Sequence, residues 1–132
     1  MTDTPMAPVS WGELLDKISI LQIKAERITD AAKRVNVVTE LTLLSDIAGS
    51  APQTVAALMA DLKAVNESLW EVEDQIRDKE AAQAFDEEFI RLARAVYVTN
   101  DRRADLKRQI NRALGSHLVE EKSYKPYTAG AK

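Results

Sequence analysis

Three polar residues interrupt the apolar face of a predicted long helix in the last third of the chain. Asn100, Arg103 and Lys107 continue the spacing of three and four residues that Leu92 and Val96 begin. Burying an unpaired charge is costly, so the two cationic head groups must either reach water or meet a partner. An arginine beside a lysine is also typical of sites that bind phosphate or carboxylate groups.

Two interpretations of this cluster stay open. In the first, the stems of Arg103 and Lys107 pack in a helix interface while their heads reach water, and Asn100 fixes the register against Asn66. In the second, the cluster lines a cationic pocket between helices for a phosphate, a nucleotide sugar or a dicarboxylate.

Another set of candidate cations lies on a helix predicted near the N-terminus, where Lys17, Lys24 and Arg27 share one stripe. Glu13 and Lys17 are spaced to form an ordinary surface ion pair. The default interpretation is a solvated face. The stripe becomes an anion-binding candidate only if it faces the same cavity as Arg103.

The composition argues against several other kinds of site. Cysteine is absent and His117 is the only histidine, so we predict neither a metal site nor a catalytic triad. No glycine-rich phosphate loop is present, and no cofactor is expected. Glu73 and Arg77 are spaced as a surface ion pair rather than as an acid–base site. Whether the protein is an enzyme stays open.

A long apolar seam predicts the helices that position these residues. Apolar residues recur at spacings of three and four through Val55, Leu58, Leu62, Val65, Leu69, Val72 and Ile76. This pattern predicts a helix over residues 52–79 that packs along a partner. A second long helix is predicted over 87–114, with Asp86 as its N-cap and Gly115 as its stop.

A further helix is predicted at the start of the chain. Ser10 and Glu13 match a capping box that begins a helix from Trp11 to about Lys33. One core stripe comprises Leu14, Ile18, Leu21, Ala25, Ile28 and Ala32. A second stripe comprises Glu13, Lys17, Ile20, Lys24 and Arg27, with Ile23 beside it. Because the far side carries two isoleucines, we expect the helix to be covered twice, by its own bundle and by a second copy of the chain.

Residues 30–36 are ambiguous between a continuation of the first helix and a turn. The segment that follows predicts a short helix over residues 37–48, ended by Gly49. Ser50 and Gln53 match a second capping box, with Pro52 in the first turn of the following helix.

Together these elements predict an all-α fold, in which a long antiparallel helical hairpin and one or two further helices form a small bundle. We expect a flexible lead-in over residues 1–9, a single helical domain over 10–115 and an extended C-terminal tail over 116–132. The net charge of −3 indicates no nucleic-acid partner. The sequence contains no apolar run long enough for a membrane span and no signal peptide, so we expect a cytoplasmic protein.

Four stretches resemble a bacterial family of unknown function. They are LLDKISILQIK and its flanks at 10–28, LWEVEDQIR with its flank at 66–77, FIRLARAVYVTNDRRADLKRQIN with its flank at 85–111, and LVEEKSY with its flanks at 115–127. The resemblance covers over half of the chain. It implies no assigned activity, although such proteins look to be encoded near glycosyltransferase and surface-polysaccharide genes. It therefore implies a role in envelope polysaccharide metabolism.

The stretch LLDKISILQIKAERI is also similar, in its pattern of apolar and charged residues, to the first helix of the all-helical chorismate mutases. In that family, basic residues bind a dicarboxylate at a dimer interface. The similarity covers one helix, and the remaining catalytic residues have no counterparts that we can place.

The leading functional prediction is a non-enzymatic interaction or scaffold module that forms a homodimer through the first helix, with another protein as a further candidate partner. The alternative is a protein or enzyme that binds a small anion. Its candidate residues are Arg103, Lys107, Asn100, Lys17, Lys24 and Arg27.

Overall fold

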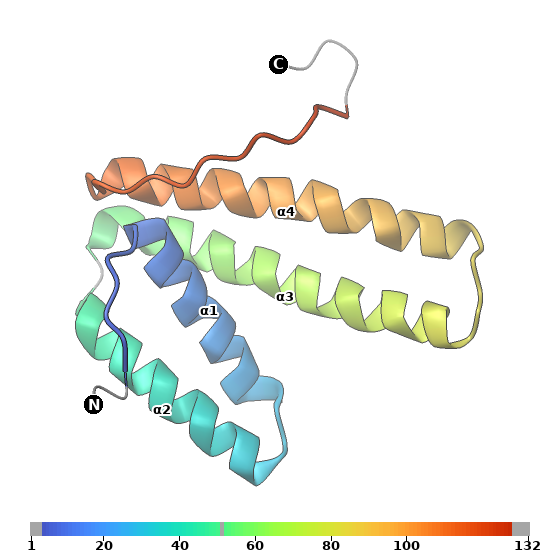
Figure 1. The fold of residues 1–132 in the computed structure, drawn as a ribbon, viewed down its shortest axis with the longest axis horizontal. Coiled ribbons are helices and arrows are strands. Elements are labelled where there is room, and N and C mark those ends of the chain that lie inside the picture. The colour runs from blue at the N-terminus through green and yellow to red at the C-terminus, as the bar shows by residue number, and fades with distance from the viewer. Residues whose placement is uncertain (1–3, 51, 128–132) are drawn as a thin grey trace.

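Four helices make up the fold of the computed structural model, which describes residues 4–50 and 52–127. They are α1 (Trp11–Arg27), α2 (Ala31–Ala48), α3 (Gln53–Ala81) and α4 (Glu87–Ala113) (Figure 1). The described residues contain no strand. The predicted all-α class is confirmed.

Helices α3 and α4 form the long antiparallel hairpin (Figure 1). The turn between them contains Gln83 at a φ of 54° and ends at Asp86, whose side chain accepts a hydrogen bond of 3.0 Å from the Phe89 backbone N–H. None of the seven seam residues is exposed, and Val55 and Leu62 are completely buried. The predicted seam and N-cap are therefore confirmed, and the seam holds the hairpin together by burying apolar surface.

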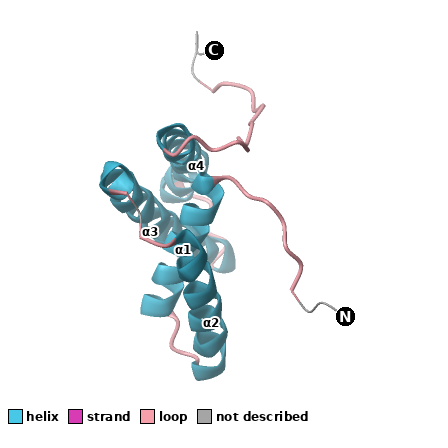
Figure 2. Ribbon diagram, turned by 90° about the vertical axis from the view of Figure 1, so that its left-hand side faces the viewer, coloured by secondary structure: helices cyan, strands magenta, loops and turns pink. Residues whose placement is uncertain are grey.

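Helix α1 is the central element, because it packs against each of the other three helices. Helix α2 packs on α1 alone and diverges from the hairpin (Figure 2). The core lies where α1 crosses one end of the hairpin. Its buried residues are Leu14, Leu15, Ile18, Leu62, Leu106 and Ile110.

Gly12 allows α1 to approach α4 closely. A Cβ atom at this position would lie 2.5 Å from the Lys107 carbonyl oxygen and 2.9 Å from Asn111 Oδ1. The two helices can therefore meet here only because residue 12 has no side chain.

The predicted end of the first helix is wrong. Helix α1 stops at Arg27, and Ile28 is extended. The Asp30 side chain accepts a hydrogen bond of 2.9 Å from the Lys33 N–H, so Asp30 is the N-cap of a separate helix that begins at Ala31. In a continuous helix, the Lys33 N–H would donate to a backbone carbonyl oxygen of the preceding turn; here it donates to the Asp30 side chain instead. The helix therefore breaks before Ala31, and α2 folds back along α1.

The second predicted capping box is also wrong. The N-cap of α3 is Pro52, and no side chain caps this helix end. Ser50 lies outside the helix. The Ser50–Gln53 spacing therefore fits the capping-box pattern in the sequence without forming a side-chain cap in the structure.

The second stripe of α1 was predicted one residue too late. The buried residues opposite Leu14 and Leu21 are Gly12, Asp16, Ser19 and Ile23. Ile23 is completely buried, and Ile20 is half-buried, within the single chain. The chain's own helices therefore cover both sides of α1, and the isoleucines no longer require a second copy of the protein.

No helix of residues 4–50 and 52–127 combines the length and the apolar character that crossing a membrane requires.

Candidate functional site

The buried carboxylate of Asp16 binds Arg103 through two hydrogen bonds. The residue is 1% exposed. Arg103 Nε lies 2.9 Å from Oδ1 and Nη2 lies 2.5 Å from Oδ2, which is the two-point geometry that a guanidinium forms with a carboxylate. The Arg103 guanidinium therefore has a buried carboxylate partner and is not free in water.

Two further polar side chains complete this cluster. Asn66 Nδ2 donates to Asp16 Oδ1 at 3.0 Å and to Ser19 Oγ at 2.8 Å. The Ser19 hydroxyl donates to the Asp16 carbonyl oxygen at 2.7 Å. We call Asp16, Ser19, Asn66 and Arg103 the buried polar cluster. It joins α1, α3 and α4 at one point.

The charge of Arg103 is stabilised in this cluster. The hydrogen bond to Asp16 raises the pKa of Arg103 above its ordinary value, and this effect exceeds the opposing effect of burial. Among the described residues, no buried side-chain nitrogen or oxygen lacks a hydrogen-bond partner. A fully satisfied group of this kind holds helices in one relative position.

Lys107 lies one turn further along α4 and is shared between two carboxylates. Its Nζ lies 2.8 Å from Glu13 Oε2 on α1 and 3.4 Å from Glu120 Oε2 in the C-terminal segment. Burial alone would lower the pKa of Lys107. The hydrogen bond to Glu13 and the negative charges of Asp16, Glu13 and Glu120 outweigh burial, so the pKa is raised.

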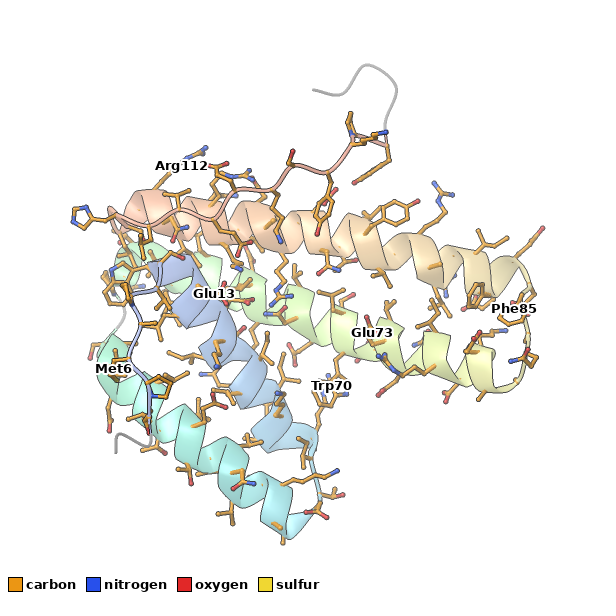
Figure 3. The ribbon with its side chains drawn as sticks, viewed as in Figure 1. Met6, Glu13, Trp70, Glu73, Phe85 and Arg112 are labelled. Atoms are coloured by element: carbon orange, nitrogen blue, oxygen red, sulfur yellow. The ribbon has the colours of Figure 1, made fainter. Side chains whose placement is uncertain are left out.

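The first capping box forms only in part, because Glu13 pairs with Lys107. The Ser10 hydroxyl accepts a hydrogen bond of 3.2 Å from the Glu13 N–H, as predicted. The Glu13 side chain does not complete the box by returning to the Ser10 backbone and instead extends toward α4 (Figure 3).

Asn111 in the last turn of α4 and Ser116 just beyond that helix accept hydrogen bonds from two further donors at the start of α1. Asn111 Oδ1 accepts a hydrogen bond of 2.7 Å from the Gly12 N–H, and Ser116 Oγ accepts one of 3.2 Å from the Trp11 N–H. These bonds link positions about one hundred residues apart in the sequence. They fix the first turn of α1 against the C-terminal end of α4.

Residues 116–127, which we call the C-terminal segment, run back along α4 without forming a helix (Figure 1). The Tyr127 ring contacts the Tyr97 ring edge-on, with centroids 5.1 Å apart. The stretch of α4 from Tyr97 to Ala113 is roughly 24 Å long, whereas twelve extended residues can span about 40 Å. The segment is therefore longer than the path it follows and leaves space beneath it.

That space is a cavity of about 750 Å³ between α4 and the C-terminal segment, which we call the tail cavity. Its size is typical of pockets that bind small molecules. Cationic side chains that line it are Arg103, Lys107, Lys122 and Lys125, and acidic ones are Glu13, Asp101 and Glu120. Tyr97, Tyr124, Tyr127 and Asn100 also line it.

The cations of the tail cavity differ in how fully they are neutralised. Arg103 and Lys107 have the partners described above, and Lys122 Nζ lies 3.1 Å from Glu120 Oε1. Within residues 4–50 and 52–127, Lys125 forms no ion pair. The exposed Lys125 ammonium is therefore the lining cation most available to a ligand.

The structure brings together only part of the predicted anion site. Asn100, Arg103 and Lys107 line the tail cavity, as the pocket interpretation requires. Lys17 and Lys24 do not line it, and Lys17 pairs instead with Glu40 of α2 at 3.0 Å. The predicted Glu13–Lys17 pair is wrong, since Lys107 and Glu40 take the two partners.

Arg27 is also distant from the tail cavity and lies against α3. Its Nη2 atom is 3.5 Å from Glu71 Oε1 and 3.9 Å from Glu67 Oε2. Its guanidinium carbon is 6.0 Å from the centre of the Trp70 ring, at the end of α1 (Figure 3). The predicted Glu73–Arg77 surface pair forms as expected.

A second cavity of about 430 Å³ lies on the other side of Arg103. Ile20, Leu69, Trp70 and Asn66 are among its lining residues, and Asn100 lines both cavities. Asn100 was predicted to fix the register against Asn66. Both residues line this cavity, but the structure shows no hydrogen bond between these two side chains, and the Asn66 amide nitrogen donates to Asp16 and Ser19.

Sequence reasoning missed two carboxylates that pair with the cations, Asp16 and Glu120, and it missed Asn111, which fixes the start of α1. Asp16 had a readable signal. Gly12, Asp16, Ser19 and Ile23 follow one another at spacings of four, three and four, which is a helical stripe of small and polar residues ending in an apolar one. Nothing in the local pattern around Glu120 indicates its contact with Lys107.

Comparison with known proteins places the chain in one family. No curated protein and no solved structure matches it. The profile described as "Family of unknown function (DUF6165)" matches residues 6–131, almost the whole chain. The chain therefore belongs to this family of unknown function.

Proposed function

We propose that the protein is a non-enzymatic binding module that takes a small anion into the tail cavity. The observation that supports this function is the cavity itself, about 750 Å³ in volume and lined by Lys107, Lys125 and three tyrosines. A phosphate or carboxylate group would pair with the two ammonium groups, and the phenol rings offer flat apolar surface to the rest of the ligand.

The arrangement supports binding rather than catalysis. Arg103 is committed to Asp16 and holds helices together. Glu13 and Glu120 both pair with Lys107. The hydrogen bond to Lys122, with the charge of Lys107, lowers the pKa of Glu120. A general acid or base requires a pKa near the working pH, which this lowering opposes for Glu120.

The test is a thermal-shift and calorimetric screen with phosphates, nucleotide sugars and dicarboxylates. We expect a member of this panel to bind, and Lys125→Ala to weaken that binding several-fold. Lys125 is exposed and unpaired among the described residues, so its removal should leave the fold intact.

Lys33→Ala is the matched control, because Lys33 is an exposed lysine on the outlying helix α2. It removes the same charge far from the cavity. A silent panel, or an equal loss of binding in the two variants, would show that the tail cavity is not the binding site.

The expected connection with envelope polysaccharide metabolism stays a prediction, and the nucleotide sugars in the panel address it. The bacterial origin and the cytoplasmic location also stay predictions of the sequence.

A second candidate function, an interaction module that forms a homodimer, is favoured by one specific observation. Helix α2 contains no buried residue, and Val35, Leu43 and Ile47 are each more than half exposed. Sedimentation at several concentrations tests it. We expect a dimer that Leu43→Glu dissociates if this candidate is correct, and a monomer at every concentration would eliminate it.

A further inference from the structure

Glu120 occupies the position that an anionic ligand would need at Lys107. The Lys107 side chain is only 11% exposed, and its two carboxylate partners are Glu13 and Glu120. Glu13 belongs to α1, whose first turn is fixed against α4 by Asn111 and Ser116. Glu120 belongs to a segment outside the helices.

The two contacts also differ in strength. Glu13 approaches the Lys107 ammonium to 2.8 Å, whereas Glu120 remains at 3.4 Å, near the limit for a hydrogen bond. Glu120 is exposed, and water screens its attraction to Lys107. The Glu120 carboxylate is therefore the partner that is easier to displace.

Glu120 would not be left unpaired if it moved away. Its other oxygen already lies 3.1 Å from Lys122 Nζ in the same segment. This hydrogen bond to Lys122 is the main reason that the pKa of Glu120 is lowered, with the attraction of Lys107 adding to it. A ligand carboxylate that replaced Glu120 would bring the same single negative charge to Lys107, and a phosphate group would bring a larger one.

The C-terminal segment has anchors on both sides of Glu120. At one end, the Ser116 hydroxyl accepts from the Trp11 N–H and donates to the Leu118 carbonyl oxygen. At the other end, Tyr127 contacts Tyr97, and a hydrogen bond to Asp101 raises the pKa of Tyr127. Residues between these anchors are exposed, so the middle of the segment can leave α4 while its ends stay in place.

We infer that Glu120 is a built-in competitor for the anion site, and that an anionic ligand displaces it from Lys107 and frees the middle of the C-terminal segment. This inference rests on the proposed function, since it requires that an anion bind in the tail cavity. The ligand class is a phosphate-bearing or carboxylate-bearing molecule small enough for that cavity. Its anionic group takes over the contact with Lys107.

The experiment measures binding of inorganic pyrophosphate and of uridine diphosphate to the full chain by calorimetry. The variants are Glu120→Gln and the matched control Glu121→Gln, which removes the same charge from the adjacent exposed residue outside the cavity lining. We expect Glu120→Gln to bind about two- to fivefold more tightly than wild type, the range that follows from losing a solvent-exposed ion pair. Glu121→Gln should bind like wild type.

The heteronuclear nitrogen-15 NOE of the backbone amides supplies a second measurement, because it reports fast motion of the chain. Ligand should lower this NOE in residues 117–124 of the wild type, and Glu120→Gln should show low values there before any ligand is added. Equal affinities in the two variants, or a higher NOE when ligand binds, would overturn the competitor inference while leaving the anion site in place. Failure of both probes to bind either wild type or Glu120→Gln would overturn the inference and the proposed function together.

Discussion

Arg103 and Lys107 lie one turn apart on the same helix, yet they belong to two different regions. Arg103 binds a carboxylate of a residue that is 1% exposed, and this carboxylate also accepts a hydrogen bond from Asn66. Lys107 pairs with Glu13 on the fixed helix α1 and with Glu120 in the C-terminal segment. The partner, rather than the type of cation, therefore decides whether a charged side chain joins helices to one another or joins a helix to a segment outside the helices.

The largest difference between these regions should appear when the buried partner is removed. We expect Asp16→Ala to lower the free energy of unfolding by about 3 kcal/mol, because it leaves a half-buried guanidinium without its carboxylate. Urea unfolding followed by circular dichroism measures this. The exposed Asp74→Ala serves as control, with an expected change within about 0.5 kcal/mol. Similar losses in both variants would mean that the buried polar cluster is not a structural joint.

The close approach of α1 and α4 can be broken separately. Gly12→Ala places a Cβ atom 2.5 Å from the Lys107 carbonyl oxygen, so the helices must move apart. We expect a loss of about 2 kcal/mol in unfolding free energy, with weaker protection of the Trp11 and Gly12 amides in hydrogen exchange. A gain in stability, as alanine usually gives within a helix, would contradict the contact.

Asn66 should contribute less than Asp16, and the two contributions should not add. We expect Asn66→Ala to cost about 1 kcal/mol, since it removes donors to Asp16 and Ser19. In the double variant with Asp16→Ala, the combined loss should fall short of the sum of the single losses, because both changes disrupt one network. Strict additivity in urea unfolding would show that the two residues act independently.

The smallest effect on stability is expected at Glu120, and it depends on pH. The pKa of Glu120 is lowered from its ordinary value of 4.5 in the folded protein. The contact with Lys122 and Lys107 is therefore present above the unfolded pKa and is lost as the pH falls through the lower folded pKa.

Carbon-13 NMR spectra of the glutamate side-chain carboxyl groups, recorded between pH 6 and pH 3, measure this effect. The Glu120 resonance is the one that disappears in Glu120→Gln. We expect it to titrate at a pH below the ordinary value of 4.5, with a change in global stability below about 0.5 kcal/mol. Titration of that resonance at or above 4.5 would contradict the contact.

Much of the fold could be predicted from local pattern. The spacing of three and four from Val55 to Ile76 predicted α3, and Asp86 and Gly115 marked the ends of α4 closely. The first helix was predicted to extend too far because Ala31 and Ala32 continue its helical spacing. The break depends instead on one side chain, that of Asp30, which caps the next helix. Apolar periodicity predicts the presence of a helix better than its ends.

The candidate site was predictable only in part. Arg103 and Lys107 stood out because a charge on an apolar helix face requires an explanation. Asp16 was missed because the second stripe of α1 was predicted one residue too late. That prediction placed Glu13 and Lys17, rather than Asp16, on the covered side of the helix. A shift of one position rotates a helical stripe by about 100°, enough to exchange a buried face for an exposed one.

The sequence by itself determined the helical class, the long hairpin and the presence of cations where the inner face of α4 changes from apolar to polar. These features depend on contacts between residues three and four positions apart, which a helix brings together wherever it lies. Only the tertiary structure decided which carboxylate each cation meets. Those pairs join residues 87 and 94 positions apart, so they exist only after α1 has crossed the hairpin and the C-terminal segment has turned back along α4.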